Sequence, residues 1–198
     1  MKCIEELLLD KNLVSTYHHK LSEKNLIFYD TETTGILKDF SQILQCGSVL
    51  TDEGLNTLGE QNIGCAPLPW VIPQPMAMIT NKKIDLFKSN ISHYQMMKDL
   101  QMQWKQWSAE NPAIFITYNG HAFDEELVRR QFFWNLLEPY TTNTNGNGRL
   151  DLMLMIHNIA AFFSDEISMP LFEGGPGISY KLEHLAIEHG IDAGDAHD

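Results

Sequence analysis

Hydrophobic residues along the chain fall into two patterns that together predict a layered α/β domain. Continuous runs rich in apolar and β-branched residues predict buried strands. These runs cover residues 26–32, 42–51, 57–65 and 113–118. The turn sequence "DEG" at residues 52–54 separates the second run from the third. Because the later strands alternate with helical patterns, we expect a mixed sheet with helices on its faces.

Apolar residues at helical spacing mark the other elements. Residues 92–108 give the clearest example, because Met97, Leu100, Trp104 and Trp107 share one face, which we interpret as a core stripe. Further helices are expected at residues 123–137, 150–163 and 180–189. Residues 1–25 are interpreted as a helical lead-in and residues 26–198 as the functional domain. A proline-rich connection, the loop "TTNTNGNG" and the flexible stretch "EGGPG" separate these elements.

Length and composition describe one ordinary globular domain. The chain has 198 residues, of which 43% are hydrophobic and 20% charged. No apolar run is long enough to span a membrane, and the acidic N-terminal stretch "MKCIEELLLDKN" does not resemble a secretory signal. The three cysteines are widely spaced, which favours neither a metal motif nor a disulfide framework. We therefore expect a cytoplasmic protein.

The charge balance argues against one class of function. With 14 basic and 26 acidic residues, the formal net charge is −12. Proteins that hold nucleic acid by its phosphates normally present a basic surface. Composition alone therefore disfavours nucleic-acid binding, unless a few basic residues and bound metal ions provide the contacts locally.

The stretch "IFYDTETTG" places two carboxylates at the end of a predicted strand. Asp30 and Glu32 are spaced i and i+2, so both side chains face the same side of the strand. Carboxylates so close repel each other unless a proton or a cation lies between them. An oxygen-only site of this kind suits Mg²⁺ or Mn²⁺. Taken alone, the pair could also be two solvated residues at a strand end.

Two further segments carry candidate chemistry. In "YNGHAFDEELVRR", a turn follows a predicted strand and places Asp124 in the first turn of the next helix. Asp124 could be a metal ligand, or it could complement the helix dipole. In the terminal "DAHD", His197 is a possible general base because its ordinary pKa lies near neutrality. A histidine so near the end of a chain could equally be a plain tail residue.

Taken together, these motifs resemble the DEDD superfamily of 3′→5′ exonucleases, in its histidine-containing branch. "YDTETTG", "NxxxFD" and the late "AHD" occur in the order typical of that superfamily. Longer segments, including "FITYNGHAFDEELVRRQFFWNLLEPY" and "YKLEHLAIEHGIDAGDAHD", resemble the catalytic domain of the bacterial exonuclease I family. The resemblance covers residues 26–198 and leaves the lead-in unexplained.

The resemblance implies a ribonuclease H-like fold, a five-stranded mixed sheet flanked by helices. It implies hydrolysis of single-stranded DNA from its 3′ end to nucleoside 5′-monophosphates, with two Mg²⁺ or Mn²⁺ ions in the complete enzyme. Asp30 and Glu32 would hold the metals, supported by Asp124 directly or through water, and His197 would deprotonate the attacking water.

The chain departs from the family pattern at its end. In the family a fourth metal-binding aspartate follows the catalytic histidine by five positions, whereas here Asp198 is the last residue. Asp192, Asp195 and Asp198 lack the expected spacing. We interpret the domain as truncated at its C-terminal end. We therefore expect weak metal binding and poor cleavage by this chain.

The resemblance also suggests substrate contacts. Glu32 and Thr33 would face the terminal nucleotide, while Arg129 and Lys181 match basic positions near the DNA strand. Tyr140 could stack on a base, although it could also cap the core. Asp151 is interpreted as structural or supporting rather than as a ligand.

Alternative functions remain open from the sequence. One is an RNA-trimming 3′→5′ exoribonuclease related to ribonuclease T or oligoribonuclease. Another is a nucleic-acid-binding module without catalysis, which the retained acidic residues disfavour. The expected partner is a single-stranded DNA 3′ end and not a membrane. A single-stranded-DNA-binding protein could also bind, through domains that this chain lacks.

Overall fold

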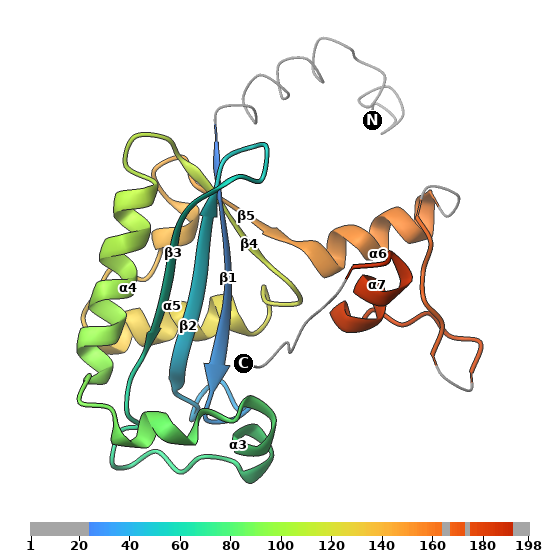
Figure 1. The fold of residues 1–198 in the computed structure, drawn as a ribbon. Helices are drawn as coiled ribbons and strands as arrows, with labels where there is room; N and C mark the ends of the chain where they lie inside the picture. Colours follow the sequence, from blue (N-terminus) through green and yellow to red (C-terminus); the bar gives the residue numbers. More distant parts are fainter. Residues whose placement is uncertain (1–23, 164–166, 173–174, 192–198) are drawn as a thin grey trace, which may run out of the picture.

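The computed structural model describes residues 24–163, 167–172 and 175–191. It is built around one five-stranded mixed sheet with the strand order β3-β2-β1-β4-β5 (Figure 1). The expected fold class, an α/β domain with a five-stranded mixed sheet and flanking helices, is confirmed. The lead-in expected for residues 1–25 lies outside the described residues up to position 23.

Four of the five strands are those that the apolar runs predict. They are β1 (Asn25–Thr33), β2 (Ile43–Thr51), β3 (Thr57–Gly64) and β4 (Ala113–Thr117). The first three pair antiparallel, and β4 joins β1 in parallel. This arrangement puts the apolar strand β1 at the centre of the sheet, with its carboxyl end beside that of β4.

The fifth strand corrects the helix that we expected to begin near residue 150. Strand β5 (Gly148–Asp151) pairs in parallel with β4, and α6 (Leu152–Phe162) begins only after it. Four residues are too few to show a strand pattern, so pairing between Leu150 and Ile116 decides the structure here. The loop before β5 also contains the short helix η2 (Thr141–Asn143).

Helices α4 (His93–Trp107) and α5 (Asp124–Trp134) cover one face of the sheet (Figure 1). Ser92 caps α4 by accepting a hydrogen bond from the backbone N–H of Gln95 at 3.1 Å. The proline-rich connection leads into α3 (Pro75–Asn81) and η1 (Lys83–Lys88) at the carboxyl end of β1. Helices α6 and α7 (Leu182–Glu188) lie together to one side of the sheet.

The core forms between the sheet and α4, as the helical stripe predicts. Met97, Leu100 and Trp104 are fully buried, and Trp107 is partly buried against the same cluster. The Trp104 ring lies 4.8 Å from that of Tyr29 and 5.2 Å from that of Phe115, measured between centroids. This packing places a buried aromatic cluster against the side of β1 that faces α4.

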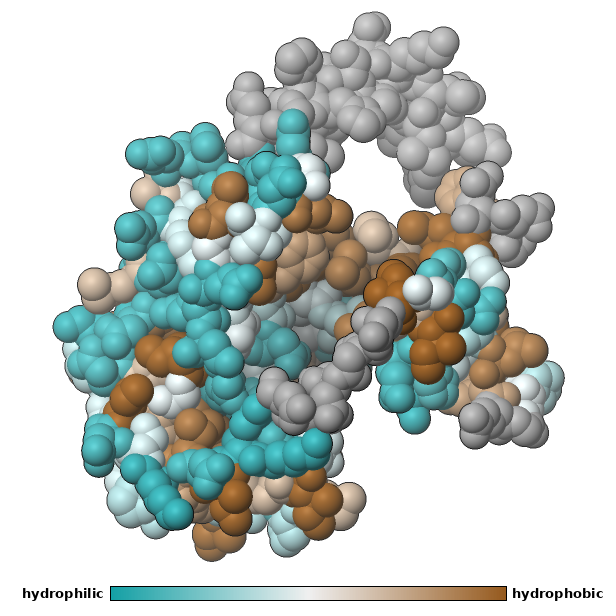
Figure 2. Space-filling model, viewed as in Figure 1, coloured by the Kyte–Doolittle hydropathy of each residue, from teal (hydrophilic) through white to brown (hydrophobic). Residues whose placement is uncertain are grey.

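The α6–α7 region has a different character. No side chain of α6 is buried, although the helix is strongly apolar. Apolar residues therefore remain at the surface there, as Figure 2 shows. Among the helices of the described residues, none is both long and apolar enough to cross a membrane.

Candidate active site

Side chains of strand β1 alternate between the buried core and the opposite face, which carries the candidate metal ligands. Ile27, Tyr29 and Thr31 point into the core and are buried, whereas Asp30 is exposed and Glu32 is half-buried on the opposite face. The i, i+2 spacing therefore puts both carboxylates on the face that α4 and α5 leave open, as expected.

A cleft of about 610 Å³ lies against this open face. Asp30 and Phe28 of β1 line it, together with Tyr118, which follows β4. The first residues of α6 and α7, Leu152 and Leu182, line it as well. A second cavity of about 710 Å³ lies at the other end of α5, near Trp134 and His93, and contains none of the predicted ligands. The cleft that contains Asp30 is the candidate active site.

Asp124 is the first residue of α5 and is buried beside this site. Its carboxylate accepts a hydrogen bond from the Thr31 hydroxyl, which links α5 to β1. Burial raises the pKa of Asp124 to about 6, the Thr31 hydrogen bond opposes this rise, and the nearby charge of Asp30 adds to it. Asp30 and Asp124 therefore act on each other electrostatically, and both being charged is unfavourable without a cation.

The turn that delivers Asp124 is held by Asp151. Asn119 adopts a left-handed conformation with φ of 59°, and its backbone N–H donates to Asp151 at 2.9 Å. The N–H of His121 donates to the other carboxylate oxygen at 3.1 Å. Asp151 also caps α6, accepting from Met153 at 3.1 Å. These contacts match the structural or supporting role expected for Asp151.

Gly120 is needed in this turn because a side chain there has no room. An added Cβ atom would lie 2.5 Å from Cβ of Thr117, whose β-branched side chain rotates poorly. We expect Gly120→Ala to cost about 1–3 kcal/mol of unfolding free energy and to displace Asp124. Urea unfolding measures the cost, with Gly175→Ala as the control because nothing lies within 4 Å there. Equal stability of the two variants would contradict the expectation.

The donor set suits a hard divalent cation that keeps part of its water shell. Within the described part of the chain, no group of three or more His, Cys, Asp or Glu side chains forms a ready-made metal site. Mg²⁺ is usually held by one or two carboxylates plus substrate phosphates rather than by a closed protein cage. Asp30 and Glu32 fit that pattern, while the assignment of Asp124 as a third ligand stays a prediction.

The predicted substrate-binding residues lie in different surroundings. The hydroxyl of Thr33 is buried and donates to the backbone carbonyl of Gly35 at 2.8 Å, so it already has a local partner. Lys181 is exposed and directly precedes Leu182 at the side of the cleft. The hydroxyl of Tyr118 donates to the carbonyl of Tyr180 and so ties this segment to the end of β4.

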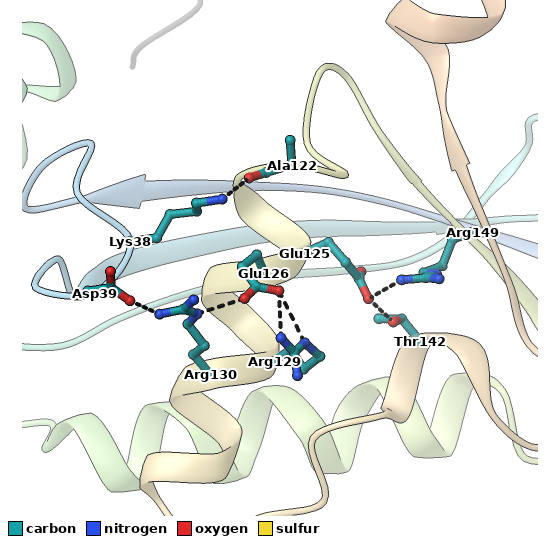
Figure 3. Close-up of polar contacts among 9 residues, drawn as sticks. All are labelled: Lys38, Asp39, Ala122, Glu125, Glu126, Arg129, Arg130, Thr142 and Arg149. Carbon is teal, nitrogen blue, oxygen red and sulfur yellow. Dashed lines mark hydrogen bonds and ion pairs between the residues drawn. The ribbon is translucent and has the colours of Figure 1, made fainter.

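Arg129 and Tyr140, two further predicted contacts, lie next to each other. The Arg129 guanidinium lies 5.9 Å from the centroid of the Tyr140 ring. Arg129 also pairs with Glu126 at 2.7 Å, and Glu126 pairs with Arg130 at 2.7 Å (Figure 3). The guanidinium therefore has internal partners, and contact with a phosphate would require it to share or exchange them. His197 and the alternatives Asp192, Asp195 and Asp198 lie outside the described residues.

The sequence motifs miss two residues that the structure places behind the site, Thr31 and Glu125. Thr31 bonds to Asp124, and Glu125 is a buried carboxylate with several partners. In the sequence, Thr31 is one of several threonines, and Glu125 looks like another acidic residue complementing the helix dipole. Thr31 lies 93 positions before its partner Asp124, and Glu125 lies 96 positions after its partner Tyr29.

The five-stranded mixed sheet with flanking helices is a ribonuclease H-like fold. Solved structures of Escherichia coli exonuclease I share this fold. The complex with a dT13 oligonucleotide matches with a TM-score of 0.79 and 24% identity, over 88% of this chain and 38% of that one. A zinc-bound complex with single-stranded DNA gives a TM-score of 0.78 and 24% identity, over 88% and 37%.

Sequence comparison gives the same resemblance. Exodeoxyribonuclease I of Buchnera aphidicola subsp. Schizaphis graminum is 28% identical over 183 residues, which cover 90% of this chain and 37% of that protein. The Escherichia coli enzyme is 26% identical over 194 residues, covering 89% and 37%. No protein-family profile matches the chain. The resemblance to exonuclease I is thus confirmed, and the chain spans little more than a third of the length of these relatives.

Proposed function

We propose that this chain is the catalytic part of a metal-dependent 3′→5′ exonuclease that acts on single-stranded DNA. The main support is the position of Asp30 and Glu32 on the open face of the central strand β1. Asp30 also lines the cleft. The electrostatic coupling of Asp30 to buried Asp124 adds a need for positive charge at this point. The named relatives and the shared fold support nuclease chemistry over other uses of such a site.

In this proposal each acidic residue has a defined task. Asp30 and Glu32 hold Mg²⁺ or Mn²⁺, and Asp124 supports the site directly or through water. His197 takes the proton from the attacking water. Two bound cations would stabilise the negative charge on the attacking water oxygen and on the leaving 3′ oxygen. Cleavage next to the terminal nucleotide releases a nucleoside 5′-monophosphate.

Two basic residues are the proposed local contacts for DNA in a chain whose net charge is −12. Lys181 directly precedes Leu182, which lines the cleft, and Arg129 lies beside Tyr140. We assign Lys181 and Arg129 to the DNA backbone and Tyr140 to a base. The solved exonuclease I structures include complexes with single-stranded oligonucleotides and one with an SSB C-terminal peptide. Single-stranded DNA is therefore the proposed substrate here, and a single-stranded-DNA-binding protein is a proposed partner.

The test is digestion of single-stranded oligonucleotides labelled at the 5′ end. With Mn²⁺, we expect a ladder of products shortened from the 3′ end and release of 5′-monophosphates. Excess EDTA should stop the reaction because it removes the cation that the acidic pair requires. An RNA of the same sequence is the matched comparison. Faster turnover of the RNA would contradict the DNA assignment, and internal cuts would contradict an exonuclease.

A further inference from the structure

A buried network centred on Glu125 lies directly behind the candidate metal site. One carboxylate oxygen of Glu125 accepts a hydrogen bond from the Tyr29 hydroxyl at 2.8 Å. The other accepts from the Thr142 hydroxyl at 2.5 Å and pairs with Arg149 at 3.3 Å (Figure 3). Glu125 is 6% exposed and Tyr29 is 5% exposed. Through these contacts, one side chain of α5 binds groups from β1, η2 and β5.

The positions of the two bonded residues relate this network to the site. Tyr29 directly precedes Asp30 on β1, and Glu125 directly follows Asp124 on α5. Since neighbouring strand residues face opposite sides, Tyr29 points into the core while Asp30 faces the cleft. The Tyr29–Glu125 hydrogen bond therefore joins, from behind, the two backbone segments that carry these candidate ligands.

Stability alone is a poor explanation for a buried carboxylate at this position. Moving a charge out of water costs several kcal/mol, and well-packed apolar residues often replace such buried groups at no loss of stability. The network instead fixes the position of α5 relative to β1, because hydrogen bonds to a charged acceptor are short and directional. Burial and the charge of Glu125 raise the pKa of Tyr29 well above its ordinary value, so its hydroxyl remains a donor.

We propose that Tyr29 and Glu125 are positioning residues that set the spacing between Asp30 and Asp124 for cation binding. This inference rests on the proposed function, because it assigns Asp30 and Asp124 to one metal site. The hydrogen bond holds the first turn of α5 at a fixed depth against β1. Without it, we expect the two carboxylates to sample a wider range of separations. Their affinity for a shared cation should therefore fall.

The experiment compares Tyr29→Phe with the wild-type chain. Mn²⁺ binding is followed by the loss of the free-ion EPR signal, and hydrolysis of single-stranded DNA is measured in parallel. We expect about 10-fold weaker Mn²⁺ binding, the range found when groups that support metal ligands are removed. At saturating Mn²⁺, kcat should fall while KM for DNA stays constant. Glu125→Gln, which keeps an acceptor for the Tyr29 hydroxyl, should retain more Mn²⁺ affinity than Glu125→Ala.

A control separates positioning from ordinary stabilisation. Gln42→Met removes side-chain hydrogen bonds to the segment after β3, at 3.1 Å to the carbonyl of Ala66 and at 2.7 Å from the N–H of Leu68, and neither group belongs to the Glu125 network. We expect this variant to lower the melting temperature and leave Mn²⁺ affinity unchanged. If Tyr29→Phe behaves in the same way, the positioning role is overturned while the nuclease proposal stands. If the wild-type chain has no Mn²⁺ site that Asp30→Asn abolishes, both proposals are overturned.

Discussion

Asp30→Asn is expected to lower the rate of single-stranded DNA hydrolysis on the order of 10³-fold, which is about 4 kcal/mol of transition-state stabilisation. The amide keeps the shape of the side chain but removes the negative charge that attracts a divalent cation. Because Asp30 is exposed on the face of β1 opposite the core, the substitution leaves the packing of the sheet intact. The initial rate of 3′-end digestion with Mn²⁺ measures the effect.

The control for this variant is Asp85→Asn, the same chemical change on an exposed carboxylate of η1. It should digest DNA at the wild-type rate. If Asp30→Asn retains more than about a tenth of wild-type activity, Asp30 is not a metal ligand of the reaction. If both variants lose activity equally, the loss reflects the change in net charge of the chain and not a specific role of Asp30.

The same substitution has a testable effect on stability through Asp124. The pKa of Asp124 is raised to about 6 in the folded chain, against an ordinary value of about 3.9. Its protonation therefore favours the folded state below pH 3.9, and this advantage is lost as the pH rises through 6. Removing the Asp30 charge lowers the pKa of Asp124. The fall in melting temperature from pH 5 to pH 8, measured with EDTA, should therefore be smaller in Asp30→Asn.

The fold could be predicted where the sequence signal is local. The apolar run of β1 and the helical stripe of α4 depend on neighbouring residues, so both elements were recognisable and both are confirmed. Strand β5 was not recognisable from "GRLD", since its structure comes from pairing with β4, more than 30 residues earlier along the chain. The five-stranded sheet was expected from the family resemblance rather than from this segment.

The site divides in the same way. Asp30, Glu32 and Asp124 could be chosen because their motifs are short and their order along the chain is distinctive. The supporting contacts of Thr31 and Glu125 could not, because each joins β1 to a helix that begins some 90 residues later. The role of His197 lies outside the described residues and stays a prediction.

Trp104→Ala is expected to cost about 3–5 kcal/mol of unfolding free energy, the usual range for removing a buried aromatic side chain. The ring is fully buried between Tyr29, Phe115 and Phe132. Its indole N–H donates to the Ser48 hydroxyl at 3.0 Å, and the substitution removes this hydrogen bond. Set against a total of about 5–15 kcal/mol for a typical domain, this loss should lower the melting temperature by roughly 10 °C.

The matched control is Trp70→Ala, because Trp70 is 75% exposed and its loss should change stability by about 0.5 kcal/mol or less. Urea unfolding of both variants gives the two free energies. Trp104 also packs on Tyr29, the residue proposed to position Asp124 against β1. We therefore expect Trp104→Ala to weaken Mn²⁺ binding even at temperatures where it remains folded. A stable variant with wild-type Mn²⁺ affinity would show that the aromatic core supports neither the fold nor the acidic site to the extent argued.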